Sequence, residues 1–172
     1  MDYQPGGSSN VADPLADPAV CDRDIPEFKK LGLNTIRVYT VDNSKSHDHC
    51  MSALEQAGIY LALDVNTPKY SLNRQDVAVS YNDVYLQSVF ATIDAFSSYN
   101  NLLLFFSGNE VINARNNTNA APYIKATTRD MRQYISAQAD RQIPVGYSSA
   151  DVSENIEQQA NYFACGQVSR FM

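Results

Sequence analysis

The segment LLLFFSGNEV, residues 102–111, places a carboxylate directly after an apolar run. Cleavage of a glycosidic bond needs one carboxylic acid to protonate the leaving oxygen and a second carboxylate to stabilise or attack the anomeric carbon. Glu110 could be the acid, because the apolar residues before it would desolvate its carboxyl and favour the protonated form. Asn109 could then hold a sugar hydroxyl. The simpler alternative is that Asn109 caps a helix and Glu110 lies in its first turn.

Polar and aromatic residues also follow the other apolar runs. Asp64 could bind another hydroxyl, and Tyr39 could stack on a sugar ring, since the chain has 11 Tyr and no Trp. Tyr147 ends the run 143–147. Asp64 could equally be a turn residue, and Tyr39 could be packed in the core. The glycines of YQPGGSSN, residues 3–10, lack the spacing of a nucleotide-binding loop and are most simply a flexible turn.

Helical patterns alternate with short apolar runs between residues 25 and 165. In the first helix Ile25, Phe28 and Leu31 share one face, and Gly32 ends the helix before a β-branched run. We predict later helices over about 51–57, 83–99, 122–135 and 154–164, and strands over about 59–65, 102–106 and 143–147. Because each strand is a continuous apolar run, we expect an α/β protein whose parallel sheet is covered on both faces. Polar groups at the carboxyl ends of such strands are typical of a (β/α) barrel active site.

Composition limits the possible partners. At 172 residues, 44% hydrophobic and 19% charged, the chain is expected to form one globular domain. Its net charge of -6 would repel nucleic acid, so we expect no nucleic-acid partner. No apolar run is long enough to predict a membrane span, and MDYQPGGSSN lacks the layout of a signal peptide. As written, the chain is expected to be neither exported nor membrane-spanning.

The three cysteines, Cys21, Cys50 and Cys165, leave two interpretations open. They are three buried free thiols, or Cys21 and Cys50 form a disulfide and Cys165 has its partner outside this chain. The segment HDHC, residues 47–50, could suggest a metal site, but its polar neighbours predict a loop and no other cluster supports it. We therefore expect no metal and no cofactor.

Six stretches of the sequence together carry a resemblance to one family. They are DYQPGGSS, DPLADPAVCDRDIPEFKKLGLNTIRVYTVD, HDHCMSALEQAGIYLALDVNTP, FFSGNEV, TTRDMRQYI and IPVGYSSAD. They resemble the fungal β-1,3-glucanosyltransferases of glycoside hydrolase family 72, over residues 2 to about 166. The resemblance implies a (β/α)8 TIM-barrel glycosidase fold. It also implies an enzyme that cuts a β-1,3-glucan donor and joins the new end to an acceptor glucan, with retention of configuration and no metal.

The resemblance also assigns roles to single residues. It makes Glu110 the general acid/base and places Gln4, Tyr39, Asp64 and Asn109 at the donor sugar subsites. These roles extend the candidate chemistry of the strand ends to Gln4, which no pattern in the sequence had indicated.

Three further sites follow from the same resemblance. It pairs Cys21 with Cys50 and gives Cys165 a partner further along the family chain. The sequence NNT, residues 116–118, is a glycosylation sequon on Asn116, used only if the chain enters the secretory path. By family, such a protein lies at the cell surface and in the cell wall, held to the membrane by a glycolipid anchor whose signal we do not expect in this chain.

The resemblance stops after YFACG. The family continues with further strands, one of which ends in the nucleophilic Glu, so we expect residues 1–166 to form about the first five βα units of an incomplete barrel and residues 167–172 to be a divergent tail. Asp64, Asp151 and Glu154 are the only nearby substitutes for the missing carboxylate. We therefore expect the chain as given to be inactive. The alternative is a non-catalytic remnant, or a partial barrel that binds β-glucan weakly.

Overall fold

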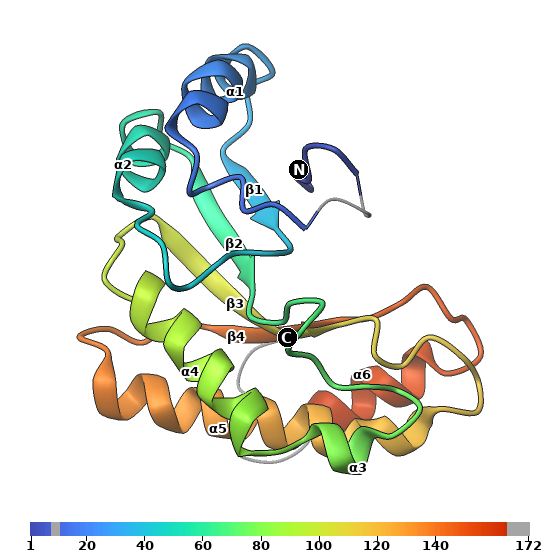
Figure 1. Ribbon diagram of the computed structural model, residues 1–172. Coiled ribbons are helices and arrows are strands. Elements are labelled where there is room, and N and C mark those ends of the chain that lie inside the picture. The colour runs from blue at the N-terminus through green and yellow to red at the C-terminus, as the bar shows by residue number, and fades with distance from the viewer. Residues whose placement is uncertain (8–10, 165–172) are drawn as a thin grey trace.

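The computed structural model describes residues 1–7 and 11–164, in which helices and strands alternate (Figure 1). The strands are β1 (Thr35–Val38), β2 (Tyr60–Asp64), β3 (Leu102–Asn109) and β4 (Val145–Ser148). The helices are α1 (Pro18–Lys30), α2 (Asp48–Gln56), α3 (Val77–Ser80), α4 (Asp83–Phe96), α5 (Ala121–Gln138) and α6 (Ile156–Ala164), with a 3-10 turn η1 (Thr118–Ala120) before α5.

All four strands are parallel and lie side by side in chain order, β1-β2-β3-β4. A parallel bridge between Asp2 and Arg37 continues the sheet beyond β1. Where five strands were predicted, the described residues therefore form four strands and one bridge. Strands that follow each other in chain order, each after a helix, are arranged as in a barrel, whereas a doubly wound sheet has its first strand in the interior. The predicted α/β class is confirmed.

Helix α1 shows how local sequence sets the element ends. Asp17 caps the helix by accepting hydrogen bonds from the N–H groups of Ala19 and Val20, and Pro18 occupies the first turn. Gly32, with φ +68°, ends it as predicted. Ile25 and Phe28 are buried, whereas Leu31, which was predicted on the same helical face, is the C-cap and is 69% exposed.

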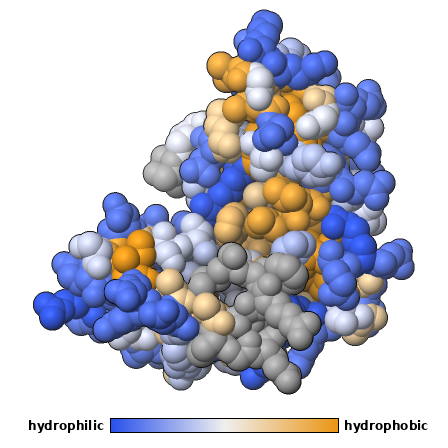
Figure 2. All heavy atoms as spheres, turned by 180° about the vertical axis from the view of Figure 1, so that it is seen from behind, coloured by the Kyte–Doolittle hydropathy of each residue, from blue (hydrophilic) through white to orange (hydrophobic). Residues whose placement is uncertain are grey.

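The sheet is covered more completely on one face than on the other. In Figure 1 the helices α1, α2, α4 and α5 lie on the same side of the twisted sheet. Along β1, Ile36 and Val38 are buried while Thr35 and Arg37 are half-buried, and Leu103 of β3 is 41% exposed. Seen from behind, apolar side chains gather in the middle of the molecule (Figure 2). The prediction of strands buried on both faces is therefore wrong for these positions.

A disulfide joins Cys21 of α1 to Cys50 of α2, with the two Cα atoms 5.6 Å apart. This is the pairing that the resemblance implied, and the alternative of three free thiols does not hold for these two cysteines. Both are almost fully buried. Cys165 lies outside the described residues.

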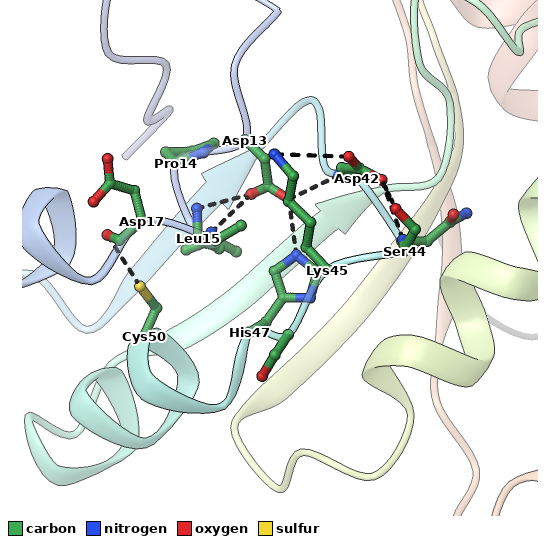
Figure 3. Close-up of polar contacts among 12 residues, drawn as sticks. Asp13, Pro14, Leu15, Asp17, Asp42, Ser44, Lys45, His47 and Cys50 are labelled. Carbon is green, nitrogen blue, oxygen red and sulfur yellow. Dashed lines mark hydrogen bonds and ion pairs between the residues drawn. The ribbon is translucent and has the colours of Figure 1, made fainter.

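The segment HDHC does not form the predicted loop, because α2 begins at Asp48. His47 is 1% exposed, and its Nε2 lies 2.8 Å from Oδ2 of Asp13. Figure 3 shows the Asp13 carboxylate between the segments that precede α1 and α2. It accepts hydrogen bonds from the N–H groups of Leu15, Ala16 and Asp42 in addition to its His47 contact. The histidine therefore ties two loops together.

Two classes of feature are absent from residues 1–7 and 11–164. No helix there is both long and apolar enough to cross a membrane. No group of at least three His, Cys, Asp or Glu side chains comes together in a way that could hold a metal ion.

Candidate functional site

A cavity of about 430 Å³ opens at the carboxyl ends of β1, β2 and β3, where side chains of parallel strands meet. All four residues predicted at the sugar subsites line it, which are Gln4, Tyr39, Asp64 and Asn109. The remaining lining residues come mostly from the segment after β2 and are Thr40, Asn66, Thr67, Pro68, Ser71, Leu72, Arg74 and Val111. A concave site of this size with converging polar groups suits a small polar ligand such as part of a sugar chain.

Arg37 lies beneath this cavity and joins the four strands. Its Nε and Nη2 donate to Oδ2 and Oδ1 of Asp64 at 2.8 and 3.0 Å, a bidentate ion pair. Nη2 also donates to Oδ1 of Asn109 at 3.1 Å, and Nη1 donates to Oγ of Ser148 at 3.0 Å. One guanidinium on β1 therefore contacts side chains from β2, β3 and β4.

Two aromatic rings pack against the same guanidinium. Its central carbon lies 4.3 Å from the ring centroid of Tyr39 and 4.4 Å from that of Phe106, within the range of cation–π attraction. The side chains of Arg37 and Asp64 are 15% and 2% exposed. Tyr39 therefore has a second function beside lining the cavity, because it packs against a buried charge.

Burial and pairing act in opposite directions on the two charges. Burial raises the pKa of the Asp64 carboxyl, and the hydrogen bonds and positive charge of Arg37 offset part of that rise. Burial lowers the pKa of Arg37, but the hydrogen bonds and charge of Asp64 outweigh it and leave the pKa raised. Arg37 therefore stays charged, and each group compensates for the desolvation of the other.

No pattern in the sequence indicated a role for Arg37. Ile36 and Val38 are both buried, and side chains alternate between the two faces of a strand, so the charged residue between them had to lie on the opposite face. This alternation was the available signal. The partner could not be inferred, because Asp64 is 27 residues away and meets Arg37 only through the pairing of β1 with β2.

Glu110 follows β3 and does not begin a helix, so the helix-cap interpretation of Asn109 is wrong. The strand runs three residues further than predicted, and Asn109 pairs with Ser148 of β4. Glu110 has φ +51° and is the one residue other than glycine with a positive φ in the described part of the chain. Its N–H donates to the Ser148 carbonyl at 2.8 Å, and its carbonyl accepts from Nη2 of Arg74 at 3.1 Å. Such backbone conformations in non-glycine residues concentrate at functional sites.

The Glu110 carboxyl is not desolvated in the expected way. Its side chain is exposed and is not among those that line the cavity, although its neighbours Asn109 and Val111 are. The apolar run that precedes it belongs to β3 and packs within the sheet. The acid/base role of Glu110 therefore stays a prediction, and burial gives no argument for it.

None of the described residues brings an unpaired carboxylate into the lining of the cavity. Asp64 is the only acidic residue among those that line it, and both of its oxygens accept hydrogen bonds from Arg37. Asp151 and Glu154, the other candidate substitutes, are exposed in the segment between β4 and α6 and do not line the cavity.

Three other residues singled out in the sequence lie in defined places. Gln4 reaches the cavity through a turn in which its carbonyl accepts a hydrogen bond from the N–H of Gly7. The hydroxyl of Tyr147 accepts from the N–H of Ile112 at 3.0 Å, so it supports the chain after Glu110 and does not line the cavity. Asn116 is exposed, and its glycosylation stays a prediction.

Comparison with known proteins gives a consistent family match. A family model described as Glucanosyltransferase, of glycoside hydrolase family 72, matches residues 1–171. The chain is 66% identical over 166 residues to 1,3-beta-glucanosyltransferase gel1 of Aspergillus fumigatus, covering 96% of this chain and 37% of that protein. It is 63% identical over 166 residues to 1,3-beta-glucanosyltransferase GAS5 of Saccharomyces cerevisiae, covering 96% of this chain and 34% of that protein. The chain thus spans little more than a third of the length of these relatives.

Solved structures of Saccharomyces cerevisiae Gas2p share the fold. The complex of Gas2p with laminaritriose and laminaritetraose superposes with a TM-score of 0.92 at 46% identity, over 98% of this chain and 38% of the other. The laminaripentaose complex gives 0.91 at 45% identity, over 98% and 39%. The predicted fold class, part of a (β/α)8 barrel, is confirmed.

Proposed function

Because the chain belongs to glycoside hydrolase family 72, the glucanosyltransferases, we propose that it is part of the catalytic barrel of a β-1,3-glucanosyltransferase. In this proposal the whole protein cleaves a β-1,3-glucan donor and transfers the new end to a second glucan by double displacement. The observation that supports it most directly is the cavity at the strand ends, with Asn109 lining it and Glu110 next in the chain. Gas2p, which has the same fold over this region, is known in complexes with laminari-oligosaccharides.

Glu110 is the proposed general acid/base, and Gln4, Tyr39, Asp64 and Asn109 are the proposed contacts to the donor sugar. The left-handed backbone of Glu110 turns the chain directly after β3, between two residues that line the cavity. Asp64 contributes mainly through Arg37, because that ion pair already occupies one lone pair on each carboxylate oxygen.

Double displacement needs a second carboxyl group about 5 to 5.5 Å from the acid, and the described residues bring no free one to the cavity. The nucleophile of the proposed enzyme is therefore supplied by residues outside the described part. We expect the 172-residue chain on its own to bind β-glucan without turning it over. A partial barrel with this binding activity alone is the second candidate function, supported by the same cavity.

Membership of the family also supports a proposal for the location. We place the whole protein at the outer cell surface and in the fungal cell wall, with a glycolipid anchor, the Asn116 glycan and the Cys165 disulfide as further expectations. Each depends on entry into the secretory path.

The proposed activity is tested by incubating laminaripentaose with the longest natural protein that contains this chain. Products both longer and shorter than the substrate are expected for transfer, whereas hydrolysis alone gives shorter products only. Glu110→Gln should abolish both, and Glu154→Gln, an exposed carboxylate away from the cavity, should abolish neither. Elongation that survives Glu110→Gln would remove Glu110 from the acid/base role. Elongation by the 172-residue chain alone would show that the second carboxylate lies within it.

A further inference from the structure

The carboxamide of Asn109 can face Arg37 in one orientation only. A guanidinium has N–H donors and no acceptor, so the Asn109 atom that lies 3.1 Å from Nη2 is the oxygen Oδ1. The NH2 group of Asn109 is therefore turned away from Arg37. In the described part of the chain this NH2 group donates to no protein acceptor, and Asn109 lines the cavity. The cavity wall thus carries a donor without a protein partner.

Arg37 is itself fixed on every side. Two of its nitrogens hold Asp64, a third holds Ser148, and its central carbon lies 4.3 and 4.4 Å from the ring centroids of Tyr39 and Phe106. Rotating the group to release Asn109 would break the bidentate ion pair at a site where Asp64 is only 2% exposed. A lysine ammonium is a point charge and cannot make these contacts at the same time.

We propose that Arg37 is a positioning residue that holds the Asn109 carboxamide with its NH2 group toward the cavity. The site then offers a hydrogen-bond donor of fixed direction to a hydroxyl oxygen of the bound glucan. The nature of this ligand rests on the proposed function, but the orientation of Asn109 in the empty protein does not. A donor fixed before binding does not lose side-chain freedom when the ligand arrives, so it favours binding more than a freely rotating amide would.

The first test uses the protein without ligand. Nuclear magnetic resonance of the 15N-labelled 172-residue chain detects the side-chain NH2 signals of Asn109, which are identified by their loss in Asn109→Asp. We expect Arg37→Lys to move these signals and Arg141→Lys to leave them in place. Arg141 is a matched control, because it is also half-buried but bonds the carbonyls of Tyr99 and Leu102 at the opposite end of β3. Unmoved Asn109 signals in folded Arg37→Lys would overturn the inference.

A second variant keeps the inference testable if Arg37→Lys does not fold. Asn109→Ala removes only the partner and leaves the Arg37–Asp64 ion pair intact. It must shift the guanidinium N–H signals of Arg37. Unchanged guanidinium signals would mean that the contact is not made.

The ligand test separates this inference from the proposed function. Laminaripentaose should bind the unmodified chain about tenfold more tightly than Arg37→Lys, which corresponds to one ordered hydrogen bond. Arg141→Lys should bind as the unmodified chain does. If the unmodified chain binds no laminaripentaose but the Asn109 signals respond to Arg37→Lys, the orientation stands and the glucan assignment fails. If laminaripentaose binds equally tightly to the unmodified chain and to Arg37→Lys, and the Asn109 signals do not respond to Arg37→Lys, the glucan assignment stands and the positioning role fails.

Discussion

Replacement of Glu110 by glycine should stabilise the protein while removing its proposed acid. Glu110 has φ +51°, a left-handed conformation that costs an L-residue about 1 to 2 kcal/mol. Glycine avoids that cost but loses about 0.5 to 1 kcal/mol through its greater freedom in the unfolded chain. The difference leaves Glu110→Gly more stable than Glu110→Ala by roughly 0.5 to 1 kcal/mol, because alanine keeps the Cβ atom that causes the strain.

Urea unfolding followed by circular dichroism measures this difference. The comparison of glycine with alanine at one position removes the contribution of the glutamate side chain, which both variants lack. The backbone bonds to Ser148 and Arg74 remain possible in both, since they involve the N–H and C=O of residue 110.

Glu154 supplies the matched control. It is also an exposed glutamate in a connecting segment, and it is not among the residues with positive φ. At that site glycine should be less stable than alanine by about 0.5 to 1 kcal/mol, the reverse of the order at residue 110. If glycine is the less stable variant at both sites, the backbone of Glu110 stores no strain and the reasoning is wrong.

Three other predictions concern stability. Cys21→Ala/Cys50→Ala should lower the free energy of unfolding by about 3 to 4 kcal/mol, because the disulfide closes a loop of 29 residues in the unfolded chain. Urea unfolding of the unmodified chain in a reductant that opens the disulfide should show the same loss. Burial raises the pKa of Tyr99 to about 12, above the ordinary value near 10, so its stabilisation is complete below pH 10 and is lost as the pH rises toward 12. Tyrosinate absorbance should show this late titration. The part contributed by Tyr99 should be missing in Tyr99→Phe, while the part contributed by Tyr81, whose pKa burial also raises to about 12, should remain. Asp13→Ala should cost about 3 kcal/mol in urea unfolding, because it leaves buried donors unpaired, whereas Asp22→Ala, whose histidine contact is exposed, should cost less than about 0.5 kcal/mol.

The elements that sequence patterns predicted well are those with local signals. Gly32 ends its helix where the sequence predicted, since only the backbone of the glycine itself is required there, and Gly58, which also has a positive φ, follows α2 in the same way. The helix predicted over about 83–99 is α4, whose buried Val89, Ile93 and Phe96 recur at helical spacing. The four residues expected at the sugar subsites reach one cavity because the ends of parallel strands necessarily meet.

The parts that sequence could not predict depend on contacts between distant strands. β3 continues to Asn109 because it pairs there with Ser148, and no residue near 109 signals that partner. The same pairing fixes Glu110 in a left-handed conformation, where local preference favoured a helix start. Arg37 was missed for the same reason, as its partners come from three other strands.

Ser148 links the two halves of the candidate site. Its hydroxyl accepts a hydrogen bond from Arg37, which holds Asp64 and Asn109, and its carbonyl accepts one from the N–H of Glu110. A shift of β4 would therefore move the proposed acid and the sugar contacts relative to each other. β4 is the last strand in the described sheet, so a strand that packed beside it in a complete barrel would also affect the position of Glu110. Catalysis that depends on sub-ångström placement would then require the complete barrel even for the residues that this chain already contains.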